Sequence, residues 1–184
     1  MTAIRSYLPG DTEHTRKVSR YHAFATLDPG TEGALLAWAQ GSGVRWPCEP
    51  DVAVPITSRA GGADIAARAC ARLGVGVLVV EDQFLGRQTR NFQTTKRLIF
   101  TAGVVVGQIM RAAELIDVVQ VYPATWQAGL PKHSDSKQRA VMLTSRKLPG
   151  WLDGKRAGFR SGCADAYGIA DWFASERKAE NEHG

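Results

Sequence analysis

Apolar and polar positions alternate along the early part of the chain in a way that predicts a β-strand. The stretch 22–28 is apolar up to a single acid, Asp28, and a Pro-Gly turn follows at once. In strict alternation, Phe24, Thr26 and Asp28 share one face of this strand. A strand that ends in an acid just before a turn places that acid at the edge of a sheet, where a ligand can reach it.

The pattern continues and predicts a mixed sheet with helices. Further strands are expected at 33–39, 51–56, 75–81 and 118–122, and helices at 63–73, 92–113, 123–126, 136–147 and 163–177. Residues 51–56 are predicted to form an edge strand, because Pro55 has no backbone N–H to donate to a neighbouring strand in the middle of a sheet. Gly74 is placed to end the first helix, and Ser134 or Ser136 to cap the fourth. Strands first, then strand–helix alternation, indicate an α/β fold with a central mixed β-sheet flanked by helices.

The sequence also predicts which helix residues are buried and how the chain is divided. Ile65 and Ile99 are expected on the buried stripes of their helices, and 151–161 is expected to be a basic loop. The chain divides into a loosely ordered polar arm at 1–20, one domain at 21–175 and a polar tail at 176–184.

Composition narrows the class of protein. The 184 residues are 44% hydrophobic, and no run approaches the roughly 18 apolar residues of a membrane span. The N-terminus also lacks a signal-peptide core, so no membrane association is expected. Three widely spaced cysteines, with no spacing typical of zinc, indicate reduced thiols and a cytoplasmic location.

Two further acids resemble Asp28 in their setting. A second apolar run ends in Glu81, and Asp165 opens an Ala-rich helical pattern. Clustered carboxylates repel one another unless a cation neutralises them, and hard oxygen ligands select Mg²⁺ or Mn²⁺ over zinc. Two such ions, roughly 3.5–4 Å apart, can activate a water and stabilise the leaving oxygen in phosphodiester hydrolysis. We therefore interpret the three acids as one metal site.

Each acid also has a simpler explanation. Asp28 could be a turn residue, Glu81 a solvent contact at a strand end, and Asp165 a charge favoured by the helix dipole. Asp82 falls on the opposite strand face from Glu81. Asp171 lies about 240° around the helix from Asp165, so neither neighbour is expected in the site.

Charge is distributed unevenly along the chain. The net charge is +5, yet residues 83–160 hold thirteen Lys or Arg against four acids, whereas the rest of the chain has more acids than bases. A basic half joined to an acidic remainder indicates a polyanionic partner. The alternative is a solvated basic surface without a partner.

Five short motifs of the chain resemble a known family. The segments DPGT at 28–31, Glu81 with QF at 83–84, YP at 122–123, KQ at 137–138 and DAYGIA at 165–170 are similar, in this order, to the RuvC family of Holliday junction resolvases. The resemblance runs from about residue 22 to 174 and implies a ribonuclease H-like fold. It implies that Asp28, Glu81 and Asp165 are metal-binding catalytic acids of a homodimeric, Mg²⁺-dependent endonuclease that nicks two opposed strands of a four-way DNA junction. Two ions are implied in each active site, and Mn²⁺ can substitute.

The resemblance extends to two residues outside the acids, and it has one departure. Phe84 matches the family aromatic that inserts among bases, with a folded-back core residue as the alternative. Lys137 matches a catalytic lysine near the scissile phosphate, with an exposed helix charge as the alternative. The family usually has a fourth metal ligand, acid or His, three residues before the last acid, and here that position is Gly162. The polar arm and divergent motifs suggest a phage or divergent member, which would act in the host cytoplasm if phage-encoded.

Basic residues near the site are expected to hold DNA phosphates without reading sequence. The first group is Arg87, Arg90, Lys96 and Arg97, and the second is Lys132, Lys137 and Arg139. Trp126 is a candidate for stacking on a base, although a Trp in this setting is more often a packing anchor.

Other functions compete with junction resolution. A protein that binds junctions or branched DNA with little or no cleavage is compatible with Gly162, and a ribonuclease acting on structured RNA fits the same fold. An actin-like ATP-binding protein also uses an Asp-x-Gly-Thr turn, but the chain has neither a second phosphate loop nor an adenosine-binding motif. No nucleotide cofactor is therefore expected.

Overall fold

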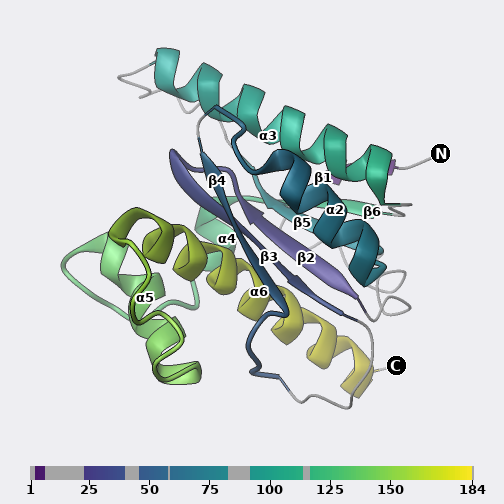
Figure 1. Ribbon diagram of the computed structural model, residues 1–184. Coiled ribbons are helices and arrows are strands. Elements are labelled where there is room, and N and C mark those ends of the chain that lie inside the picture. Colours follow the sequence, from purple (N-terminus) through teal and green to yellow (C-terminus); the bar gives the residue numbers. More distant parts are fainter. Residues whose placement is uncertain are drawn as a thin grey trace.

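Six strands form one mixed sheet, and helices cover both of its faces (Figure 1). The computed structural model describes residues 3–6, 23–39, 46–57, 59–82, 92–113 and 117–183. In chain order the elements are β1 (Ala3–Ser6), β2 (Phe24–Asp28), β3 (Glu32–Trp38), β4 (Val52–Thr57), α2 (Ala63–Leu73), β5 (Val77–Glu81), α3 (Phe92–Ala112), β6 (Asp117–Val121), α4 (Pro123–Gln127), α5 (Ser136–Lys147) and α6 (Ala157–His183). The predicted α/β fold with a mixed sheet is confirmed.

The strand order is β1-β6-β5-β2-β3-β4. The strands β1, β6, β5 and β2 run parallel, and β3 is antiparallel to both β2 and β4. Pro55 lies on β4 at the edge of the sheet, as the missing N–H of proline predicts. A search of the described helices for an apolar stretch of membrane-spanning length finds none.

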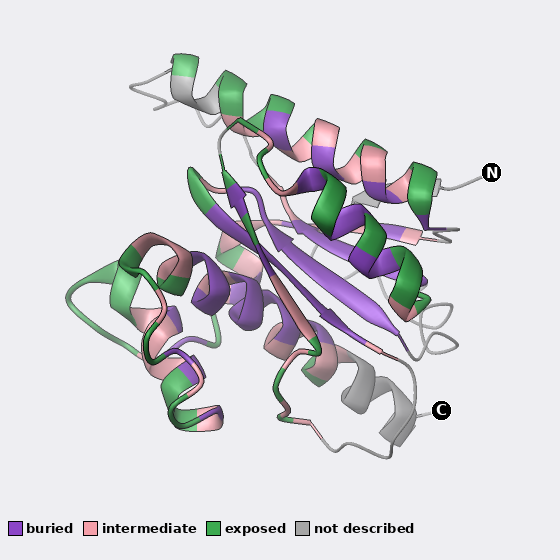
Figure 2. Ribbon diagram, viewed as in Figure 1, coloured by how far each residue is buried: buried purple, intermediate pink, exposed green. Residues whose placement is uncertain are grey.

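Side-chain alternation divides the core into two layers. Phe24, Leu36 and Val79 face the layer of α4, α5 and α6, whereas Leu27 and Leu78 face α2 and α3. Burial is concentrated in the central strands and on the side of α6 that faces them (Figure 2). Because β2 and β5 are covered on both faces, only the ends of these strands can present polar side chains to a ligand.

The strand β1 shows that the prediction for the N-terminal arm is wrong in part. The arm at 1–20 was expected to be loosely ordered, but residues 3–6 form β1, which pairs in parallel with the outer edge of β6. The segment AIRS has no apolar period, so side-chain pattern gives no signal for it. Backbone hydrogen bonding to an open sheet edge accounts for the strand instead.

Helix ends and buried faces differ from prediction in three places. The last helix begins at Ala157, six residues before the expected start, so part of the predicted basic loop is helical. Asp135, rather than either serine, caps α5 by accepting a 2.9 Å hydrogen bond from the backbone N–H of Lys137. Ile65 and Ile99 are 55% and 41% exposed, so the predicted stripes of α2 and α3 are wrong at these positions.

On α3 the buried positions are Thr101, Val105 and Ile109, which recur every four residues. The packing stripe is therefore rotated by part of a turn from the one expected. The segment GVVVG at 103–107 places apolar or small residues on every side of this helix. The sequence pattern therefore does not show which side packs against the sheet.

Candidate active site

Asp28 and Glu81 lie side by side at the ends of adjacent parallel strands. In the β2–β5 pair, Leu27 is opposite Val80, so the next step of the register brings Asp28 to the level of Glu81. Both side chains point to the α6 face, because the residues two positions earlier, Thr26 and Val79, face α6. The predicted alternation of both strands is confirmed.

Asp165 is brought to the same end of the sheet by the packing of α6. The hydroxyl of Thr26 donates a 2.8 Å hydrogen bond to the carbonyl oxygen of Ala166, and both residues are fully buried. This bond holds α6 over β2 two residues before the end of the strand. Residues 140 positions apart in sequence thus meet, and the three acids predicted to cluster occupy one region of the structure.

Burial and the charges of neighbouring acids raise the pKa values of Asp28 and Asp165. Burial and then the charge of Asp165 raise the pKa of Asp28 to about 7, partly offset by the hydrogen bond that the Gly30 N–H donates to Asp28 Oδ1 at 2.8 Å. Burial and then the charge of Glu81 also raise the pKa of Asp165 to about 7, and Lys137 opposes this shift. The coupling is pairwise, from Asp28 to Asp165 and from Asp165 to Glu81.

Glu81 has a polar neighbour that the sequence pattern did not assign to it. The indole Nε1–H of Trp126 donates a hydrogen bond to Glu81 Oε1 at 3.2 Å. Trp126 is 2% exposed, so the packing interpretation of this residue is confirmed, and base stacking is excluded in this structure. No local motif signals this contact, because it joins residues 45 positions apart on α4 and β5.

Gly162 lies where α6 packs directly on the start of β3. A Cβ placed on Gly162 would collide with the backbone carbonyl oxygen of Glu32 and would come within 2.7 Å of the Gly33 carbonyl carbon. A Cβ on Gly158, one turn earlier, would collide with the carboxylate of Glu32. Glycine at these positions therefore permits close helix–strand packing, which explains why two residues with poor helix propensity lie inside a helix.

The donor set fits a hard divalent cation by its chemistry. It consists of carboxylates, two of them held in surroundings that raise their pKa, and a nearby cation would relieve both burial and mutual repulsion. Among the described residues, no three Asp, Glu, His or Cys side chains already lie close enough together to enclose an ion. The structure thus provides a convergent group of acids rather than a closed coordination cage.

The structure of the chain is similar to solved structures of known proteins. Thermus thermophilus RuvC in complex with a Holliday junction substrate is similar to the chain with a TM-score of 0.59 and 16% identity, over 84% of this chain and 96% of that one. A second structure of Thermus thermophilus RuvC has a TM-score of 0.53 and 18% identity, over 83% and 95% of the two chains. The chain has the RuvC fold. No protein-family model and no curated protein matches the sequence.

This likeness confirms the predicted ribonuclease H-like fold. In this fold the three acids occupy the ends of two central strands and one face of the last long helix. Asp171 lies away from them, since it forms a 2.5 Å ion pair with Lys147 and accepts a 2.7 Å hydrogen bond from Trp46 Nε1. The prediction that Asp171 stays outside the site is confirmed.

The basic residues expected to hold DNA have different environments. Lys96, Arg97, Lys132 and Lys137 are exposed, whereas Phe84, Arg87 and Arg90 lie outside the described residues. Arg139 is half-buried, and its guanidinium donates to the carbonyl oxygens of Gln127, Leu130 and Pro131 at 2.9 to 3.2 Å. The guanidinium of Arg139 thus holds the loop that follows α4.

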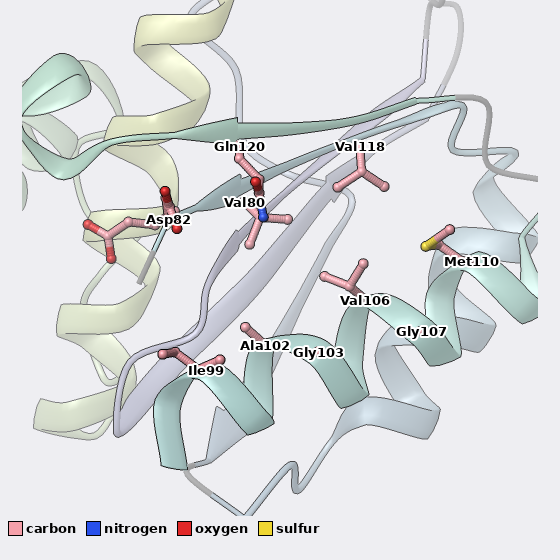
Figure 3. Close-up of a pocket in the computed structure, with 11 residues that line it drawn as sticks. Val80, Asp82, Ile99, Ala102, Gly103, Val106, Gly107, Met110, Val118 and Gln120 are labelled. Atoms are coloured by element: carbon pink, nitrogen blue, oxygen red, sulfur yellow. The ribbon is translucent and has the colours of Figure 1, made fainter. Parts of the chain in front are cut away.

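A pocket of about 470 Å³ lies between α3 and the strands β5 and β6, on the face of the sheet opposite α6. Figure 3 shows Ile99 and Ala102 of α3 across from Val80 and Gln120 of the sheet. Glu81 lines this pocket together with Ile99, so the first turns of α3 lie near the end of β5. Lys96 and Arg97 belong to α3, and their position beside the acids stays a prediction.

Proposed function

We propose that this protein is a divalent-metal-dependent endonuclease that resolves four-way DNA junctions by paired phosphodiester hydrolysis. The main support is the convergence of Asp28, Glu81 and Asp165 at one end of the sheet in a RuvC-like fold. Carboxylates in this arrangement suit Mg²⁺ or Mn²⁺, and two ions per site is the composition that phosphodiester hydrolysis favours.

Asp28, Glu81 and Asp165 would hold the ions through carboxylate oxygens. When bound, the ions supply Lewis-acid activation of water and stabilisation of the leaving oxygen. The chain's own residues orient these ligands: the Gly30 N–H fixes one oxygen of Asp28, and the buried Thr26–Ala166 hydrogen bond fixes the height of Asp165 above the sheet. Lys137 is electrostatically coupled to Asp165, so its ammonium is placed to attract a phosphate to the acids.

Exposed basic residues on two sides of the acids would hold the arms of the substrate. Lys96 and Arg97 belong to α3, Lys132 lies between α4 and α5, and Lys137 belongs to α5. Phosphate contacts of this kind bind DNA by charge and position, not by sequence. Two nicks in opposed strands require two active sites, so we propose that the chain acts as a homodimer on branched DNA.

A second candidate is a protein that binds junctions but cuts them poorly. The observation that favours it is the contact of α6 with β3 at Gly162, which leaves no space for a side chain at the position of the fourth ligand usual in RuvC resolvases. A site with one ligand fewer would bind one of its ions weakly, while the basic surface would still bind DNA.

The deciding experiment presents four labelled substrates to the purified protein: a four-way junction, a linear duplex, a flap and an RNA hairpin, each with Mg²⁺ or with EDTA. The proposed function requires paired nicks in the junction with Mg²⁺ and none with EDTA. Binding of the junction without nicks in any metal supports the second candidate. Preferred cutting of the RNA hairpin identifies a structured-RNA nuclease, and equal cutting of all substrates contradicts junction selectivity.

A further inference from the structure

We propose that Trp126 is a positioning residue that fixes the Glu81 carboxylate and the spacing between β5 and α6, so that Glu81 and Asp165 can bind the same metal centre. This inference rests on the proposed function of the acids as metal ligands. It assigns to Trp126 neither substrate contact nor metal coordination, since an indole N–H only donates hydrogen bonds.

A hydrogen bond joins the indole of Trp126 to the Glu81 carboxylate. The Nε1–Oε1 distance of 3.2 Å joins an almost fully buried indole to a half-buried carboxylate at the end of β5. A carboxylate has about four acceptor sites on its two oxygens, so one indole bond restricts its rotation without occupying all of them. Hydrogen bonds that orient ligands in this way are a general feature of metal sites.

The same indole also contacts α6. A Cβ on Gly168 would come within 2.7 Å of Cζ3 and 3.1 Å of Cε3 of Trp126, so the ring lies directly against the helix backbone. Gly168 is three residues after Asp165, on the next turn of α6. One rigid side chain thus touches the helix that carries Asp165 and the carboxylate that ends β5.

The backbone that carries the indole is held by neighbouring elements. Trp126 belongs to α4, which begins with Pro123 directly after β6. The guanidinium of Arg139 donates to the carbonyl oxygens of Gln127 and Leu130 at 2.9 and 3.2 Å, immediately after the tryptophan. The backbone that carries the ring is therefore fixed from α5, and the ring has little freedom to release Glu81.

The test replaces only the donor group. Incorporation of benzothienylalanine at position 126 exchanges the indole N–H for sulfur and keeps the shape of the ring. We expect the apparent affinity for Mn²⁺, measured by electron paramagnetic resonance of the free ion, to fall about 10- to 100-fold. The melting temperature of the metal-free protein is expected to stay within about 2 °C of the wild type, since the packing surface is unchanged.

A pair of glycine variants tests the same contact from the other side. Gly168→Ala places a methyl group against the indole and is expected to weaken Mn²⁺ binding without altering any acid. Gly103→Ala is the matched control, because a Cβ on this exposed helical glycine has no atom within 4 Å. It should leave Mn²⁺ affinity unchanged.

The outcomes separate the inference from the function on which it rests. If the wild type binds Mn²⁺ and the benzothienylalanine protein binds it equally well, Trp126 is a packing residue only. A fall in Mn²⁺ affinity that Gly103→Ala reproduces also overturns the inference. A wild-type protein that binds no Mn²⁺ overturns the metal site itself, and the role of Trp126 with it.

Discussion

At the scale of single residues, the buried carboxylates make the metal-free protein sensitive to pH. The pKa of Asp28 in the folded chain is about 7, well above the ordinary value of 3.8, because of burial first and of Asp165 second. The folded state therefore binds this proton more tightly than the unfolded state. The contribution to stability is fully present below about pH 4 and is lost as the pH rises through about 7.

Asp28→Asn should stabilise the metal-free protein at alkaline pH. The amide keeps an acceptor for the Gly30 N–H but carries no charge, so the free energy of unfolding at pH 8 in EDTA is expected to rise by on the order of 2 kcal/mol. The difference should shrink toward pH 5, where Asp28 is protonated in the folded wild type. Urea unfolding at both pH values measures it.

The exposed acid Asp64 on α2 provides the control, because Asp64→Asn changes the same charge away from the site. It should shift stability by less than about 0.5 kcal/mol at either pH. A variant Asp28→Asn that is less stable than the wild type at pH 8 in EDTA would contradict the account of Asp28 as a buried, repelled carboxylate.

Replacing Gly162 with a family-type ligand is expected not to improve cutting, although the sequence resemblance would imply that it should. Gly162→His restores a type of ligand usual in the family, yet its Cβ would collide with the backbone of β3. We expect it to lower the free energy of unfolding by about 2 kcal/mol or more and to give no gain in junction cutting. Gly107→His, on α3 where a Cβ has open space, should be tolerated better. Faster cutting by Gly162→His without loss of stability would show that α6 is not held closely on β3.

At the scale of elements, the docking of α6 on the sheet determines the site. The sequence predicts β2, α2 and β5 well, because each has a period or a run of apolar residues bounded by a turn or a glycine cap. It does not predict the first turns of α6, because Gly158 lies in the expected loop, Gly162 lies just before the expected helix, and only the contact with β3 explains two glycines in a helix. In these turns, tertiary packing outweighs the poor helix propensity of glycine.

The candidate site shows the same division between local and long-range information. The three acids are visible in the sequence because each ends or begins a predicted element. The contacts that orient them, from Thr26 to Ala166 and from Trp126 to Glu81, join residues 140 and 45 positions apart. No periodicity or motif can report such pairs.

Thr26→Val tests the docking of α6 directly. The substitution keeps the shape of the side chain and removes the buried hydrogen bond to Ala166. We expect a loss of about 1 kcal/mol in the free energy of unfolding, measured in urea, because the carbonyl of Ala166 can keep its bond within the helix. Stability equal to that of the wild type would indicate that this hydrogen bond does not hold the helix in place.

At the scale of the whole molecule, the basic surface should make DNA binding strongly dependent on salt. Each Lys or Arg that neutralises a phosphate contributes about 0.9 to the slope of log K against log salt. Lys132→Ala is expected to reduce this slope by about 1, for linear duplex and junction alike. Fluorescence anisotropy at several salt concentrations gives the slope.

The control for this prediction is Arg72→Ala, which removes an exposed positive charge from the last turn of α2 on the opposite face of the sheet. Its slope should match that of the wild type. Equal reductions from Lys132→Ala and Arg72→Ala would indicate a general effect of net charge rather than a DNA-binding surface near the acids.

The central claim is that three acids from distant parts of the chain form one metal-dependent cutting site. The most direct measurement is the rate of junction nicking by the wild type and by Asp165→Asn in Mg²⁺, with junction affinity measured in parallel and Asp64→Asn as control. We predict at least about 100-fold slower nicking by Asp165→Asn, equivalent to ~3 kcal/mol of lost catalysis, with junction affinity nearly unchanged. Nicking by Asp165→Asn at the wild-type rate, or nicking by the wild type in EDTA, would contradict the account.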